Sequence, residues 1–259
     1  MLTLTAAGRT DTGRVRKSNE DSMLVSEKFV AVADGLGGHA AGEVASGIAV
    51  DRLAELSRTH SVHPDDVTAA IADANHRILE QMRAHPENEG MGTTVTGLGI
   101  VDLGGAPHCV VFNVGDSRVY RFVGDTLERV TVDHSEVEEL QAAGLISAQD
   151  AATHPRRNVV TRCLGSFPGP TPDLWVHAPR GDERYVVCSD GLTNEVADHD
   201  IADTLRRHPD PGAAADALLA QALAAGGRDN IAVIVVDLVS EDSRPVDIDT
   251  APRARTGQA

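Results

Sequence analysis

Residues 32–46 read Val-Ala-Asp-Gly-Leu-Gly-Gly-His-Ala-Ala-Gly-Glu-Val-Ala-Ser, and the rest of the chain is organised around them. An apolar run, Phe29 to Ala33, stops at the carboxylate of Asp34, where a glycine-rich loop begins and leads into a helical pattern. Glycines allow positive φ angles and let backbone groups approach an ion closely. The stretch indicates either a metal or anion site at a strand end, or a tight turn in which Asp34 only caps the helix.

The composition favours one packed domain. The 259 residues contain no Pro/Gly/Ser-rich break, and the hydrophobic content of 41% is ordinary for a globular protein. Aromatic residues make up only 3%, so Val, Leu, Ile and Ala must build the core. The net charge of -16 leaves no basic face for nucleic acid or anionic lipid.

The three cysteines and the absence of long apolar segments indicate the compartment. Cys109, Cys163 and Cys188 lie far apart and form no Cys-x-x-Cys pair, which favours a reducing environment. Cys109 and Cys188 fall inside apolar strand patterns and should be buried. No segment resembles a secretory signal or approaches the roughly 18 apolar residues of a membrane span. We therefore expect a cytoplasmic protein without a membrane partner, and we also expect a monomer.

Carboxylates recur at the ends of predicted strands. Residues 23–25 and 29–33 read as a β-hairpin that brings Glu20 and Asp21 to the end where Asp34 stands. A later strand, residues 184–189, ends at Asp190. The hairpin therefore predicts that three carboxylates, those of Glu20, Asp21 and Asp34, converge.

Asp229 and Asn230 lead straight into the apolar run 231–239, which is typical of a strand buried on both faces. Like Asp34 and Asp190, Asp229 stands at a strand terminus beside glycine. Helix capping alone does not readily explain three such placements.

Helices and further strands fill the remaining chain. Apolar spacing predicts a helix from Glu43 and a second helix from Pro64, packed together on one side of a sheet. Residues 91–133 read as strands at 91–101, 109–114, 118–123 and 127–132. We expect hairpin turns at residues 115–117 and 124–125, which makes the last three strands a β-meander and Asp116 a turn residue unless a motif says otherwise.

Residues 133–165 interrupt the strand pattern with a short helix at 136–143 and a polar stretch. An insertion of this kind is typical of a segment that lies over one end of a domain, and it could form a mobile flap. Two more helices are expected at 201–205 and 213–225. Residues 241–259 are polar with Pro and Arg, so we expect a disordered tail there.

The carboxylate set points to a particular kind of chemistry. Asp and Glu without His or Cys select a hard cation, Mg²⁺ or Mn²⁺. Two such ions bridged by one carboxylate, about 3.5–4 Å apart, lower the pKa of a shared water and hold a phosphoryl group. Arg16, four residues before Glu20, is the candidate guanidinium for gripping the phosphate.

Six motifs stand in one order along residues 4–239: Arg16-Lys-Ser-Asn-Glu-Asp-Ser22, Asp34-Gly-Leu-Gly-Gly-His39 with Gly42-Glu43, Gly92-Thr-Thr94, Gly115-Asp-Ser-Arg118, Ser189-Asp-Gly191 and Gly227-Arg-Asp-Asn230. In this order and spacing they resemble the metal-dependent Ser/Thr protein phosphatases of type 2C, especially their compact bacterial members. The resemblance implies an α+β fold, a four-layer α/β/β/α sandwich of two antiparallel sheets flanked by helix pairs.

The resemblance also implies roles for the site residues. Arg16 resembles the phosphate-binding arginine, and Glu20 and Asp21 resemble acids that hold metal-bound waters. The implied metal ligands are Asp34 as the bridging carboxylate, Gly35 through its carbonyl, Asp190 and Asp229 on the first ion, and Asp116 on a third, looser ion.

The chain departs from the family pattern at two positions. Asn194 stands where many relatives have an Asp that shares the third ion with Asp116, and a neutral ligand should weaken that ion. Leu36 stands where eukaryotic relatives carry a histidine proposed as general acid. His39 is nearby, either as a functional group or as a loop histidine near the helix start.

We expect a phosphatase domain at residues 1–240, with a flap subdomain at about 133–165, and a tail at 241–259. The expected function is hydrolysis of phosphoserine and phosphothreonine on proteins by a metal-activated water at a binuclear Mn/Mg centre. The expected partners are phosphoproteins, among them Ser/Thr protein kinases and their substrates. Two alternatives stay open, namely a catalytically idle regulatory binding module and a small-molecule phosphoesterase.

Overall fold

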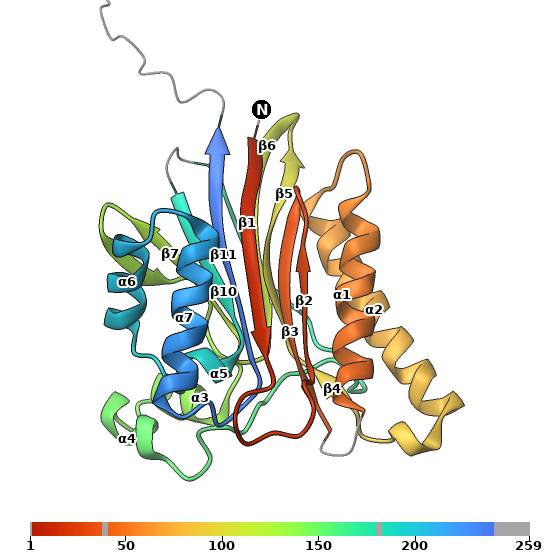
Figure 1. Cartoon of the computed structure of the whole chain (residues 1–259). Helices are drawn as coiled ribbons and strands as arrows, with labels where there is room; N and C mark the ends of the chain where they lie inside the picture. Colours follow the sequence, from red (N-terminus) through yellow and green to blue (C-terminus); the bar gives the residue numbers. More distant parts are fainter. Residues whose placement is uncertain (1, 38–40, 180–182, 241–259) are drawn as a thin grey trace, which may run out of the picture.

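The protein is a four-layer sandwich in which two β-sheets lie face to face and helices cover both outer faces (Figure 1). The computed structural model describes residues 2–37, 41–179 and 183–240. The expected tail at 241–259 and His39 lie outside these residues. The expected α/β/β/α architecture is confirmed.

The first sheet has five antiparallel strands in the order β1-β11-β10-β7-β8. Its strands are β1 (Leu2–Asp11), β7 (Arg118–Val123), β8 (Thr126–Arg129), β10 (Glu183–Cys188) and β11 (Ile231–Ser240). The second sheet has the order β2-β3-β5-β6-β9, with β4 paired to β3. Its strands are β2 (Asp21–Val25), β3 (Phe29–Leu36), β4 (Gly92–Thr93), β5 (Val95–Leu103), β6 (Ala106–Val114) and β9 (Asp173–His177).

The helices lie on the two outer faces and at one end of the sandwich (Figure 1). The second sheet is covered by α1 (Gly42–Ser57) and α2 (Pro64–Ala84), which is followed by the 3₁₀ turn η1 (Pro86–Asn88). The first sheet is covered by α6 (Asp198–Arg207) and α7 (Pro211–Ala225). At the end of the sandwich where β3 terminates lie α3 (Glu136–Ala142), α4 (Ala148–Thr153) and α5 (Asp190–Thr193).

Strands β3 and β11 explain why the layers stack in this order. In β3 the side chains of Phe29 and Ala31 enter the core beneath α1 and α2, whereas Val30 and Val32 enter the core between the sheets. The side chains of β11 likewise alternate between the inter-sheet core and the core beneath α6 and α7. Successive side chains of a strand point to opposite faces, so a continuous apolar run is buried on both. The prediction of an inner strand at 231–239 is confirmed.

The expected β-meander is wrong at its first turn. Strand β6 pairs with β5 and β9 in the second sheet, whereas β7 pairs with β10 and β8 in the first sheet. Residues 115–117 therefore carry the chain from one sheet to the other, and only the turn at 124–125 closes a hairpin. The two kinds of turn use the same residue types, so long-range pairing partners decide between them.

The other expected strands and helices are present, but the expected strand at 91–101 is divided into β4 and β5, and the expected strand at 127–132 ends at Arg129. The hairpin of β2 and β3 and the paired helices α1 and α2 are confirmed. Strand β9 and the short helices α4 and α5 were not predicted. Cys109 and Cys188 are buried, and burial raises the pKa of each thiol to about 12. Among the described residues, every helix is too short or too polar to cross a membrane.

Close packing at Gly97 provides a test of the second sheet. Gly97 pairs with Ala31 on one side and Phe112 on the other, and a Cβ at this position would collide with the carbonyl of Val30 and the ring of Phe112. We expect Gly97→Ala to lower the free energy of unfolding by about 1–3 kcal/mol because neither neighbour can yield without strain.

The matched control is Gly47→Ala in α1, where a Cβ would meet no atom within 4 Å. This change should raise the free energy of unfolding by about 0.5–1 kcal/mol, since alanine loses less backbone entropy in a helix. Urea unfolding of the two variants measures both effects. Equal effects of the two changes would contradict this account of the sheet.

Candidate metal centre

The hairpin of β2 and β3 places two acids side by side at its open end. Asp21 and Asp34 are direct partners across the two strands. The backbone of Asp34 is fixed from the next strands, because its N–H donates to Thr94 Oγ1 (3.0 Å) and its carbonyl accepts from Thr93 Oγ1 (2.9 Å). The predicted convergence of Glu20, Asp21 and Asp34 is confirmed in position.

One cavity of about 220 Å³ collects nearly all the predicted site residues. Its lining is Arg16, Glu20, Asp34, Gly35, Leu36, Gly37, Asp116, Asn158, Val160, Asp190, Asp229 and Asn230. Asp21 does not line the cavity; it is buried behind it, where Ser189 Oγ donates to Asp21 Oδ2 (2.7 Å). The cavity thus brings together strand ends from both sheets, β3 from the second and β10 and β11 from the first.

The carboxylates in and behind this cavity are held in an unfavourable electrostatic environment. Burial, and then the charges of Asp21 and Asp190, raise the pKa of Asp34 well above its ordinary value. Burial also raises the pKa of Asp21 and of Asp116 to about 7 each, with Asp190 adding to both shifts. The pKa of Asp190 rises for the same reason, with the charge of Asp229 as the next cause. Each carboxylate would be more easily ionised beside a cation.

The side chain of Glu20 lies against the first residue of α1. A Cβ at Gly42, the first residue of that helix, would collide with the Glu20 carboxylate. Burial and the nearby charge of Glu43 raise the pKa of Glu20. Its carbonyl accepts from Ser46 Oγ (2.6 Å) and from the N–H of Gly35 (3.2 Å), so its backbone is fixed against both α1 and β3.

Arg16 lies at the edge of the cavity with its side chain half exposed. Its Nη2 donates to Asp229 Oδ2 at 2.8 Å, and the other Asp229 oxygen, Oδ1, accepts from the N–H of Asn230 at 2.8 Å. The predicted phosphate-binding arginine and a predicted metal ligand are therefore ion-paired with each other. This pairing was not foreseen from the sequence.

The residues present fit a hard divalent cation. The described lining residues supply several oxygen ligands and include no His or Cys. In the described part of the chain, Asp21 Oδ1 is buried without a hydrogen-bond partner. Crowded, half-buried carboxylates are stabilised by a bound cation, which Mn²⁺ or Mg²⁺ would provide. Across residues 2–37, 41–179 and 183–240, no three His, Cys, Asp or Glu side chains already enclose a common point. The fit therefore rests on charge, burial and donor type.

Asn194 and Leu36 occupy the positions where the sequence departs from the family pattern. Asn194 ends α5, and its Nδ2 donates to Asp190 Oδ2 at 3.0 Å. It also lines a polar cavity of about 380 Å³ beneath α3 and α4, together with Asp116 and Asp190. Leu36 lines the smaller cavity and has no proton to donate.

Sequence reasoning missed several polar residues that support the site. Ser189 links the two sheets, since its Oγ donates to Asp21 and accepts from the N–H of Ala232 (2.9 Å). Asn230 binds the segment that carries Arg16. Ser189 precedes the predicted ligand Asp190, and Asn230 follows the predicted ligand Asp229. A polar residue next to such an acid, at either end of an apolar strand, was therefore the available signal.

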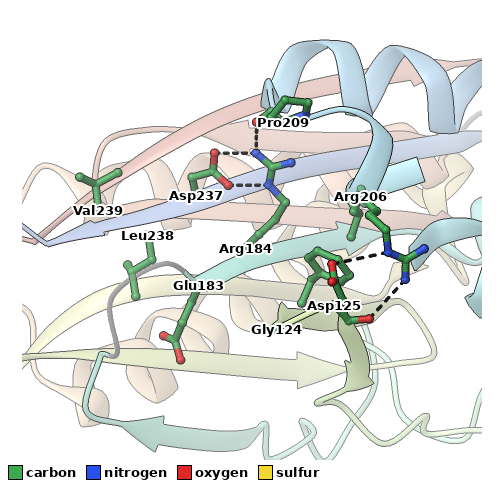
Figure 2. A pocket seen from close by; sticks show the side chains of 11 residues that line it. Gly124, Asp125, Glu183, Arg184, Arg206, Pro209, Asp237, Leu238 and Val239 are labelled. Atoms are coloured by element: carbon green, nitrogen blue, oxygen red, sulfur yellow. Dashed lines mark hydrogen bonds and ion pairs between the residues drawn. The ribbon is translucent and has the colours of Figure 1, made fainter. Parts of the chain in front are cut away.

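A larger cavity of about 640 Å³ lies elsewhere, among β7, β10, β11 and α6 (Figure 2). Its Arg184 forms an ion pair with Asp237 and also donates to the carbonyls of His208 and Pro209. Its Arg206 is paired with Asp125. These two guanidiniums are already engaged, and the strand-end carboxylates lie at a different place, so the smaller cavity is the better candidate for phosphate chemistry.

Comparisons with known proteins find relatives over most of the chain. The family described as "Protein phosphatase 2C" matches residues 9–231. The chain is 36% identical to the serine/threonine protein phosphatase PstP of Mycobacterium tuberculosis over 250 residues, which cover 93% of this chain and 46% of PstP. It therefore spans about half the length of that curated relative. The serine/threonine phosphatase stp of Listeria welshimeri is 36% identical over 88% of this chain and 94% of its own length.

Solved structures extend the likeness to the fold. The crystal structure of Mycobacterium tuberculosis PstP/Ppp superposes with a TM-score of 0.85 at 37% identity, covering 92% of this chain and all of that one. The catalytic domain of PstP in complex with two manganese ions superposes with a TM-score of 0.83 at 36% identity, covering 93% of this chain and all of that domain.

Replacing Asp116 tests the electrostatic strain in the cavity. Because the folded-state pKa of Asp116 is raised to about 7, the folded protein retains a proton at pH 5–6 that the unfolded chain has released. In chelator, protonation of Asp116 therefore adds to the free energy of unfolding of the wild type at low pH, and this contribution is lost as the pH rises from about 4 to 7. Asp116→Asn has no such proton to lose. By urea unfolding, the variant should match wild type at pH 4 and exceed it by about 1–3 kcal/mol at pH 8. A difference that stays constant with pH would contradict the assignment.

Proposed function

The chain belongs to the protein phosphatase 2C family, and we propose that it hydrolyses phosphoserine and phosphothreonine in proteins at a centre of two Mn²⁺ or Mg²⁺ ions. The observation that carries the proposal is the convergence of Asp34, Asp190 and Asp229 from two sheets in one small cavity with Arg16 at its edge. A family member that had become an idle binding module would not need to retain these mutually repelling acids.

The proposed ligands are residues of the 220 Å³ cavity. Asp34 would be shared by both ions, Gly35 would offer its carbonyl, and Asp190 and Asp229 would hold one ion, while Glu20 and Asp21 would hold waters. Bound ions of this kind lower the pKa of a water and neutralise charge on a phosphoryl group. Gly35 must remain glycine, because a Cβ there would collide with the carbonyls of Gly42 and Glu20.

The proposed task of Arg16 is to bind the phosphate. A guanidinium can grip two phosphate oxygens at once, and in this acidic cavity it provides a positive charge at the entrance. The pairing of Arg16 with Asp229 holds that charge beside the cavity rather than in solvent. Leu36 cannot protonate the leaving serine or threonine oxygen, so that proton must come from water or from another side chain.

Residues 133–165 form the proposed flap that shapes substrate choice, within a phosphatase domain of residues 1–240. The flap contributes Asn158 and Val160 to the cavity wall. We further propose a cytoplasmic monomer that acts on phosphoproteins, among them Ser/Thr protein kinases and their substrates. A sedimentation mass twice that of the chain would contradict the monomer, and unchanged peptide preference after exchange of residues 136–158 would contradict the flap.

An activity assay with two substrates tests the function. A phosphothreonine peptide and p-nitrophenyl phosphate should both be hydrolysed only with Mn²⁺ or Mg²⁺ present, and the peptide should give the higher kcat/KM. Asp190→Asn should lower kcat/KM on the order of 100-fold or more, because it removes charge from the proposed ion site without removing core volume.

The control is Asp51→Asn, which changes an exposed carboxylate on α1 and should leave turnover unchanged. Hydrolysis of p-nitrophenyl phosphate alone would favour a small-molecule phosphoesterase. No hydrolysis of either substrate would favour an idle binding module. Wild-type turnover by Asp190→Asn at saturating Mn²⁺ would contradict the assignment of Asp190 as a ligand of the first ion.

A third, weaker ion near Asp116 is a separate proposal, and Asn194→Asp tests it. The new carboxylate would replace the amide that donates to Asp190, so it should lower the free energy of unfolding in chelator by like-charge repulsion. With Mn²⁺ present it should lower the concentration needed for half-maximal rate, and Asp116→Ala should reduce the rate without loss of the other ions. Identical Mn²⁺ activation curves for wild type and both variants would leave this ion without a role.

A further inference from the structure

Residues 12–20 form a loop that carries Arg16 and ends at Glu20, and it lies against the start of β11. We propose that Asn230 is the positioning residue that fixes this loop, here named the Arg16 loop, so that Arg16 is held where phosphate binds. This inference rests on the proposed function for its phosphate readout, whereas its structural basis is independent.

One side-chain amide binds the loop at three points. Asn230 Nδ2 donates to the carbonyls of Thr12 (2.9 Å) and Ser18 (2.8 Å). Its Oδ1 accepts from the N–H of Glu20 (2.9 Å). An asparagine side chain that donates twice and accepts once in this way has both its N–H groups engaged, and Asn230 is only 5% exposed.

The positions of these contacts matter more than their number. Thr12 and Ser18 lie at the two ends of the segment that projects toward solvent, and Arg16 lies between them. The same amide nitrogen therefore joins both ends of the loop. Within it Val15 is 67% exposed, so apolar packing does little to fix its shape. The position of the Arg16 backbone depends largely on how the loop ends are held.

A second set of contacts fixes the beginning of the loop to the same region. The N–H of Arg14 donates to the carbonyl of Gly227 (2.7 Å), and its Nε donates to the carbonyl of Leu223 (2.8 Å). Gly13 has a φ of +78°, and a Cβ there would collide with the carbonyl of Asp229. The loop thus lies directly on residues 227–230, which also provide Asp229.

These contacts couple two groups of the proposed site. Asn230 follows Asp229 in the chain, and its own N–H donates to Asp229 Oδ1. Asn230 therefore contacts the acid that pairs with Arg16, the loop that carries Arg16 and the backbone of Glu20. Displacement of a positioned charge by about 1 Å can cost on the order of 100-fold in rate, so loss of the Asn230 contacts to Thr12 and Ser18 should weaken phosphate binding even with the Arg14 contacts in place.

The first measurement compares Asn230→Ala with Asn75→Ala. Asn75 is a matched control, because its buried amide also bridges loop backbone, at Gly165 and Ser166, away from Arg16. The inhibition constant for inorganic phosphate should rise about 10-fold in Asn230→Ala and stay unchanged in Asn75→Ala, while the Mn²⁺ concentration for half-maximal rate stays unchanged in both. An unchanged phosphate constant in Asn230→Ala overturns the proposal.

The second measurement asks whether Asn230 acts through Arg16. Arg16→Ala should itself weaken phosphate inhibition, and adding Asn230→Ala to it should produce no further increase. Such non-additivity is expected when one residue acts by positioning the other. Full additivity of the two effects would assign Asn230 a merely structural role and overturn the proposal.

The third measurement needs no activity and so separates this inference from the proposed function. Asn230→Asp has the same shape and keeps the oxygen that accepts from the Glu20 N–H, but it replaces the two N–H donors. It also keeps the test available if Asn230→Ala does not fold. In chelator, limited trypsin digestion should cut Asn230→Asp after Arg14, Arg16 or Lys17 several-fold faster than wild type or Asn75→Asp. Equal cutting rates overturn the proposal even if the enzyme is fully active, and faster cutting supports it even if no phosphatase activity is found.

Discussion

The site depends on the face-to-face packing of two antiparallel sheets. Val30 and Val32 of β3 share one apolar layer with Val187 of β10 and Ile234 of β11. That layer fixes the end of β3 beside the ends of two strands that belong to the other sheet. The free energy of burying this layer can therefore hold Asp34, Asp190 and Asp229 together against their mutual repulsion.

The same packing explains why a few polar side chains at the end of the inter-sheet core fix the position of the acids. Ser189 bridges β2 and β11, and Thr93 and Thr94 fix the backbone of Asp34 from the strands beside it. These hydroxyl groups bind the acids or their backbone without adding charge. They satisfy buried polar groups at the end of the sandwich, where the apolar inter-sheet core ends.

Local patterns predicted most strands, the paired helices and the acids at strand ends, whereas the four-layer sandwich and the roles of the site residues were implied by the resemblance to the phosphatase family. The continuous apolar run at 231–239 predicts a strand buried on both faces, and acids beside glycine mark the strand ends. The path at residues 115–117 was not predicted, because a Gly-Asp-Ser turn fits a hairpin and a crossover equally well. Strand β9 was missed for a similar reason: its position is set by pairing with β6. The pairing of Arg16 with Asp229 joins residues more than 200 positions apart and has no local signature.

The topology also orders events during synthesis. All strands of the second sheet, with α1 and α2, lie between residues 21 and 177, so this half can pair and pack as soon as that segment has emerged. Strand β1, by contrast, pairs along its length with β11, at residues 231–240. Of the described strands, β1 is therefore the first to be synthesised but must wait for β11, and domains built this way close their most distant contacts late. The acid cluster is completed only at that final step, so a nascent chain carries no assembled centre until β11 is in place.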